Sequence, residues 1–132
     1  MTEEEALIRS FIVKEKRQRL VDLLANPKRR KKVTSSLAHF RDLDPRWVVP
    51  IPTHQQHAAD IERLLRGRGA GDTCYAVSES SALDGKTLPL GNALKEVVGY
   101  GMGTLLSCAP GTLAYFEGEG PSDRCILERR AT

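Results

Sequence analysis

The stretch GTLLSCAPGTLAYFEGEGPSDRCILE, residues 103–128, decides the fold. It holds three short apolar runs in succession, TLLSCA, TLAYFE and RCILE, each typical of a strand that is covered on both faces. The joins between them, APGT and EGEGPS, are too short for a crossover connection. The three runs are therefore predicted to be antiparallel neighbours in one sheet.

Two more strands are predicted upstream of this stretch. The run TCYAVS, residues 73–78, has the same buried-strand character. The run RWVVPI, residues 46–51, is β-branched, and Pro50 restricts it to the edge or the end of a strand because proline cannot donate to the ladder.

Helices are predicted between these strands. One begins at Thr53 and stops at Gly67 or Gly69, and the next spans residues 88–98 and stops at Gly99. Residues 46–132 are thus predicted to form an α/β core with a mixed sheet of about four or five strands in the order β-α-β-α-β-β-β. The strands are expected to be parallel where helices intervene and antiparallel at the C-terminal end, and an α+β fold is the alternative.

Residues 1–45 are predicted to form a helical extension of this core, and residues 1–132 a single domain. Thr2 and Glu5 suit a helix start, and apolar residues recur at three-and-four spacing up to about residue 25. Whether residues 3–25 form one helix or bend near Val13 stays open. Asn26 and Pro27 are expected to cap and begin a further helical segment.

Composition favours a soluble cytoplasmic protein. Apolar residues make up 40% of the chain and charged residues 28%, and no apolar run approaches the length of a membrane span. The acidic start MTEEEALIRS does not resemble a secretory signal. The three cysteines are widely spaced within apolar runs, which favours reduced buried thiols, so no disulfides are expected. No cofactor is expected either.

The glycine repeat in EVVGYGMGTLL, residues 96–106, resembles a phosphate-binding loop only in composition. Such loops run from a strand into a helix N-terminus, where free amides face the anion. Here the order is helix, glycines, strand, so the glycines should meet carbonyl groups, which repel anions. They are therefore predicted to end a helix and to permit a close backbone approach.

The loop after residues 73–78 is the first candidate ligand or catalytic site, because ligands gather beyond the carboxyl ends of parallel strands. If the predicted strand TLLSCA runs parallel to residues 73–78, its Ser-Cys pair lies at the same edge of the sheet as this loop and can supply a nucleophile. The candidate residues are Ser78, Glu79, Ser81, Asp84, Lys86, Ser107 and Cys108. The alternative is a turn whose serines and aspartate bond the local backbone, with a cysteine that only fills the core.

The second candidate site is the run Lys28, Arg29, Arg30, Lys31 and Lys32. Residues 1–47 hold twelve Lys and Arg against seven Asp and Glu, whereas residues 48–132 hold eight against ten. Such a cluster suits the phosphates of nucleic acid or an acidic protein partner. The alternative is a solvated helix start, although cations there oppose the helix dipole.

The histidines give no metal prediction. His54 and His57 are three residues apart, with Asp60 three further on, but no recognised metal-binding motif accompanies them. No metal ligand is therefore assigned.

The sequence thus predicts a small binding or accessory protein without a readable catalytic signature. One alternative is RNA binding through residues 28–32, and another is a small hydrolase or transferase that uses the loop 78–86. A protein partner or a homodimer stays open, and it would call for an exposed apolar patch, expected on the N-terminal helices.

Overall fold

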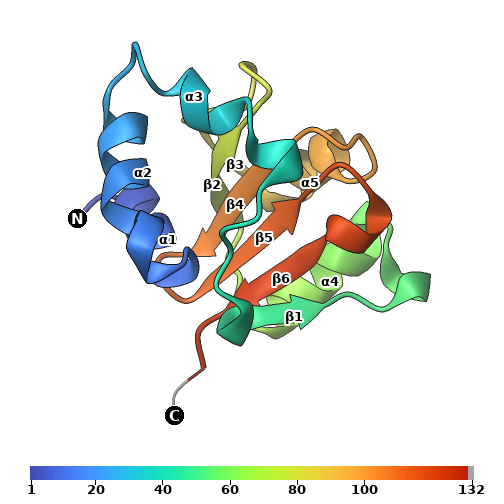
Figure 1. Ribbon diagram of the computed structural model, residues 1–132. Coiled ribbons are helices and arrows are strands. Elements are labelled where there is room, and N and C mark those ends of the chain that lie inside the picture. Colours follow the sequence, from blue (N-terminus) through green and yellow to red (C-terminus); the bar gives the residue numbers. More distant parts are fainter. Residues whose placement is uncertain (131–132) are drawn as a thin grey trace.

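The computed structural model describes residues 1–130, which form an α+β fold of three layers (Figure 1). A six-stranded sheet lies between an N-terminal helical layer and a second layer of two helices. The helices are α1 (Glu3–Phe11), α2 (Arg17–Ala25), α3 (Lys31–Thr34), α4 (Ala58–Gly67) and α5 (Leu90–Val97). The strands are β1 (Val48–Pro50), β2 (Thr73–Ser78), β3 (Thr87–Pro89), β4 (Thr104–Ala109), β5 (Leu113–Glu117) and β6 (Cys125–Glu128).

The strand order is β1-β6-β5-β4-β2-β3, and every neighbouring pair is antiparallel. The hairpin arrangement predicted for the last three strands is confirmed, as is the helical N-terminal segment. The expectation of parallel neighbours is wrong, and the α+β alternative describes the fold. The sheet also has one strand more than the largest number expected, because β3 is not among the predicted strands.

Strand β3 explains why the mixed sheet does not form. It pairs with β2 in a hairpin and reverses the chain before α5 begins. Helix α5 therefore joins β3 to β4, two strands that run in the same direction on either side of β2. Helix α4 likewise joins β1 and β2, which share a direction but lie far apart in the sheet. The helices do connect strands of equal direction, but these strands are not neighbours.

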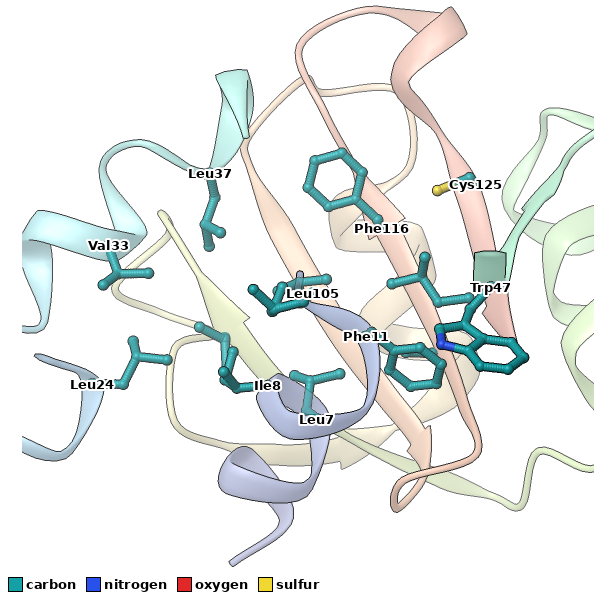
Figure 2. Packing of buried hydrophobic residues seen from close by; sticks show 14 residues of the cluster. Leu7, Ile8, Phe11, Leu24, Val33, Leu37, Trp47, Leu105, Phe116 and Cys125 are labelled. Atoms are coloured by element: carbon teal, nitrogen blue, oxygen red, sulfur yellow. The ribbon is translucent and has the colours of Figure 1, made fainter. Parts of the chain in front are cut away.

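Side chains alternate between the two faces of the sheet, as the strand period requires. Leu105 and Phe116 face the N-terminal helices, where they pack with residues such as Leu24 of α2 and Val33 of α3 (Figure 2). Their chain neighbours Leu106 and Tyr115 face α4 and α5. Both faces are thus buried, which accounts for the near-continuous apolar character of β4 and β5 in the sequence.

The N-terminal segment contains two helices with a bend between them. Helix α1 ends at Phe11, a 3₁₀ turn spans Lys14–Lys16, and α2 begins at Arg17. The bend is held by an isolated bridge in which Ile12 pairs with Leu43. The chain after the helices thus returns to fix the angle between α1 and α2.

Two helix starts differ from the predictions. Asn26 accepts a bond from the Lys28 amide as a cap should, but the chain then forms turns, and α3 begins only at Lys31. Likewise, Thr53 begins a 3₁₀ turn, and α4 starts at Ala58. Proline and capping residues therefore mark the right regions, but the first turns are not α-helical.

The glycines after α5 stop the helix as predicted. Helix α5 ends at Val97, and Gly99 follows with φ of +93°. Gly103 lies where the segment Leu37–His39 crosses the start of β4, and a Cβ atom there would overlap the backbone nitrogen of Ala38. Only glycine permits this close approach. Among residues 1–130, no helix is long and apolar enough to cross a membrane.

Candidate functional site

The two candidate sites of the sequence meet at one ion-pair cluster. Arg30, from the basic run, makes two hydrogen bonds to Asp84 in the loop after β2, Nε to Oδ2 at 2.5 Å and Nη2 to Oδ1 at 2.9 Å. Its Nη2 also lies 2.7 Å from Oε1 of Glu4, which accepts a further bond from the Tyr75 hydroxyl. The hydrogen bond to Asp84 is the main cause of the raised pKa of Arg30. The guanidinium charge is therefore used within the fold.

An open cavity of about 320 Å³ lies beside this cluster. Its walls come from the basic segment and from the loop after β2. The lining residues are Pro27, Arg30, Lys31, Thr34, Ser35, Ser78, Glu79, Ser81 and Asp84. The structure thus brings together four of the seven predicted loop residues and adds two members of the basic run.

The polar groups of this loop mainly serve its own structure. The carboxylate of Asp84 accepts the amide of Ser78 at 2.9 Å, and the hydroxyls of Ser78 and Thr104 lie 2.8 Å apart. The amide of Ser80 donates to the Ser78 hydroxyl at 3.0 Å. Within residues 1–130, no serine hydroxyl bonds a histidine or a carboxylate, the arrangement that activates a nucleophile. The loop therefore resembles the turn that was its alternative interpretation.

Ser107, Cys108 and Lys86 lie outside this cavity. Because β2 and β4 are antiparallel, Ser78 pairs with Thr104, and Ser107 lies about 10 Å further along β4. Ser107 and Cys108 are buried on opposite faces of the sheet, and Lys86 is exposed in the β2–β3 turn. The shared sheet edge that a parallel pair would have given these residues does not exist.

The three cysteines are free and buried. Burial raises the pKa of Cys74 and of Cys125 to about 12, and it raises the pKa of Cys108 as well. The thiols are therefore protonated and poorly nucleophilic at neutral pH.

The basic run does not act as one surface. Lys28 and Arg29 are exposed in the turn after α2, and Arg30 turns inward. Lys31 lines the cavity beside Asp84, whereas Lys32 lines a different cavity on the other side of α3. The run thus divides its charges between two sites.

That second cavity, of about 430 Å³, is named here the basic groove. It lies between α2 and the segment from α3 to Asp42, and its lining has cationic walls with an apolar floor. The lining residues are Lys16, Arg19, Leu20, Leu23, Lys32, Val33, Ser36, His39, Phe40, Arg41 and Asp42. Lys16, Arg19, Lys32 and Arg41 make no ion pair within the described part of the chain. Their charges are therefore free to meet an anionic ligand.

The sequence contains a signal for the α2 wall that the predictions did not use. Arg19, Leu20 and Leu23 lie three, four and seven residues after Lys16, a spacing that places side chains on one side of a helix, and Lys16 directly precedes α2. The opposite wall was not readable, because Lys32 and Arg41 reach α2 only through the fold. Prediction was therefore limited to the run that is contiguous in sequence.

The glycine loop does hold an anion, contrary to the prediction from its polarity. The amides of Gly99 and Gly101 donate to Oε2 of Glu117 at 3.1 and 3.2 Å. Oε1 of this fully buried carboxylate accepts from the Tyr115 hydroxyl at 2.6 Å and from Nε of Arg124 at 3.1 Å. The positive φ angles of Gly99 and Gly101 accompany this arrangement, in which the chain's own side chain occupies the position of a ligand.

His54 and His57 are exposed, and residues 1–130 contain no cluster of three or more potential metal ligands. The exposed large apolar side chains of the same range are Met1, Tyr100 and Met102. Tyr100 and Met102 lie in the glycine loop, whereas Leu20, Leu23 and Phe40 of the N-terminal segment are half-buried in the basic groove. The apolar patch expected on the N-terminal helices stays a prediction.

Comparisons of the chain with known protein families, with curated proteins and with solved structures returned no match.

Proposed function

We propose that this chain is a binding protein that holds nucleic acid on the basic groove. The observation that carries the proposal is a set of four cations that line one concave surface without ion pairs in residues 1–130: Lys16, Arg19, Lys32 and Arg41. Each cation in contact with a phosphate releases condensed counterions, and this release favours binding at low salt.

The contrast with the arginines of α4 supports a ligand for these charges. On α4, Arg63 pairs with Asp60, and Arg66 pairs with both Glu62 and Asp72. The arginines of the second helical layer are thus neutralised by neighbours. In the groove, one carboxylate, that of Asp42, accompanies four lysine and arginine side chains. An excess of unpaired positive charge in a concave site raises the local concentration of anions.

The test is fluorescence anisotropy with labelled oligonucleotides of about 12 nucleotides, within the usual site size of small single-strand binders. We expect binding to weaken about fifty-fold between 50 and 200 mM salt if all four cations contact phosphates. Arg19→Ser and Lys32→Ser should each weaken binding. Lys95→Ser, an exposed cation on α5 outside the groove, is the matched control. Absence of binding at 50 mM salt, or equal effects of Lys32→Ser and Lys95→Ser, would contradict the proposal.

An acidic protein segment is the competing partner for the same charges. Polyglutamate and an oligonucleotide of equal charge should be compared as competitors in this assay. The proposal expects the oligonucleotide to displace the labelled probe at much lower concentration. Equal displacement would favour an acidic protein instead.

A cytoplasmic location belongs to this proposal. The three free buried thiols support it, because a reducing compartment keeps cysteines in this form. Fractionation of cells that express the chain, followed by immunoblotting, tests the location, and recovery outside the cytoplasm would contradict it.

The glycine loop supports a second candidate function, self-association. Tyr100 is 69% exposed and Met102 is 39% exposed, and both line a cavity of about 340 Å³ together with Leu83 and Val97. Tyrosine and methionine are enriched in protein interfaces, and the bonds of Gly99 and Gly101 to Glu117 hold the loop in place. Sedimentation over a range of concentrations should detect a dimer that Tyr100→Ser weakens. A monomer at all concentrations would exclude it.

A further inference from the structure

We infer that the basic groove takes a single strand of nucleic acid, with one unpaired base stacked on Phe40 and the amino group of that base donating to Asp42. The inference rests on the proposed function, because it names the form of nucleic acid that the same groove binds. The shared chemistry is a phosphodiester chain with accessible bases, which RNA and DNA both supply.

The apolar floor of the groove is the first observation. The half-buried side chains of Leu20, Leu23 and Phe40 line it, together with the buried Val33. A phosphate chain that only spans the walls leaves this floor facing water or charge, and neither arrangement is favourable. A base brings an apolar face that covers the floor while its phosphates reach the walls.

Phe40 has the position of a stacking platform. It is half-buried and lines the groove, while its ring centroid lies 6.5 Å from that of Phe116 at an interplanar angle of 48°. Its amide donates to the Leu37 carbonyl at 3.1 Å, which fixes the backbone at the same point. The ring is therefore ordered before a ligand arrives, and less entropy is lost on stacking.

The second observation is the carboxylate of Asp42, which favours contact with a base over contact with a phosphate. It is the one carboxylate in the lining of the groove, and its side chain has no hydrogen-bond partner within residues 1–130. Its backbone is fixed, since its carbonyl accepts the Val13 amide at 2.8 Å. A carboxylate repels phosphates, whereas it accepts hydrogen bonds from the exocyclic amino groups of bases. Cytosine and adenine carry such a group and uracil does not.

A duplex does not fit this set of contacts. Its bases are stacked and paired, so their faces cannot reach Phe40. The groove has the volume of a small-molecule pocket rather than of a duplex-binding surface. The structure therefore favours single strands over duplexes of equal charge.

The experiment compares labelled oligo(C), oligo(A) and oligo(U), as RNA and as DNA, with a duplex of equal charge. We expect single strands to bind at least about tenfold more tightly than the duplex, as stacking of one base permits. Phe40→Leu, which keeps apolar packing against Phe116, should remove this advantage while the duplex affinity stays constant. Phe40→Tyr, which keeps an aromatic face at the same position, is the matched control and should retain the advantage.

Asp42→Ala tests the contact to the amino group. It removes a negative charge, so all oligonucleotides should bind more tightly, but the preference for oligo(C) and oligo(A) over oligo(U) should disappear. Thermal unfolding of each variant checks that the fold is intact. A higher affinity for RNA or for DNA identifies the natural form, and both support the inference.

Two results overturn the inference and leave the proposed function intact. One is that single strands and duplex bind equally tightly, and that Lys32→Ser abolishes this binding whereas Phe40→Leu does not change it. The other is a preference among bases that Asp42→Ala leaves unchanged. Absence of all binding at about 50 mM salt contradicts the proposed function itself.

Discussion

Arg30 and Asp84 are 54 residues apart in the sequence, and they form a two-point ion pair, with Nε 2.5 Å from Oδ2 and Nη2 2.9 Å from Oδ1. Asp84 also accepts the Ser78 amide at the end of β2, and Arg30 donates to the Leu24 carbonyl at the end of α2. The pair thus connects the N-terminal helical layer to the end of β2. It also fixes the direction in which α3 begins, and so the position of the groove wall that carries Lys32.

Arg30→Ala should lower the free energy of unfolding by about 2 kcal/mol, because it leaves the carboxylates of Asp84 and Glu4 partly buried without their charged partner. Urea unfolding measures the change. Arg29→Ala removes an exposed neighbour of the same type and should stay within about 0.5 kcal/mol of the unchanged protein. Equal effects of the two substitutions would show that the ion pair adds nothing to stability.

Local sequence patterns, such as join lengths and glycine positions, predict much of this fold. Short joins identify the β4–β5–β6 meander, and Gly99 marks the end of α5. The failure at β3 has a physical cause. Its three residues end in Pro89, which equally suits the first turn of a helix, so nothing local distinguishes a short edge strand from a helix start. That one strand decides whether the neighbours of β2 run parallel to it.

The site was less predictable than the fold. Composition identifies the basic run, but only the fold turns Arg30 inward and sends Lys31 and Lys32 to different cavities. The glycine loop shows the same limit. The helix dipole argues against an anion there, yet positive φ angles allow two amides to reach Glu117. Contacts between distant segments cannot be obtained from local pattern alone.

Glu117→Gln should destabilise the protein by about 3 kcal/mol, because the buried guanidinium of Arg124 loses its charged partner. In addition, the NH₂ group of the new glutamine must face groups that donate hydrogen bonds to the Glu117 carboxylate. Thermal and urea unfolding measure the loss. Glu119→Gln, two residues later and mostly exposed, is the matched control and should have little effect. A Glu117→Gln variant as stable as the control would show that the carboxylate does not hold the glycine loop.

Asp44 should make stability depend on pH in the acid range. Its pKa is lowered chiefly by the hydrogen bond from the Arg46 side chain, although burial acts in the opposite direction. A lowered folded pKa means that the stabilisation is complete above the unfolded value of about 4 and is lost as the pH falls through the folded pKa. The difference in unfolding free energy between the protein and Asp44→Asn should therefore be constant near neutral pH and shrink below about pH 4. A difference that is independent of pH down to about pH 2 would contradict this assignment.

Gly103→Ala and Gly67→Ala should act in opposite directions. At position 103 the new methyl group meets the backbone of Leu37 and Ala38, so we expect a loss of at least about 3 kcal/mol. At Gly67, the last residue of α4, nothing lies within 4 Å of the position that a Cβ atom would take, and alanine should stabilise by about 0.5 kcal/mol. Calorimetry of both variants measures the signs. A mild effect at position 103 would show that the Leu37–His39 segment does not lie against β4.

The salt dependence of single-strand binding tests the central claim most directly. If Lys16, Arg19, Lys32 and Arg41 all contact phosphates, the logarithm of the binding constant should fall with the logarithm of salt concentration with a slope of about −3. Lys32→Ser should reduce that slope by about 0.7, and Lys95→Ser should leave it unchanged. A slope near zero, or one that Lys32→Ser does not alter, would contradict the assignment of the basic groove as the nucleic-acid site.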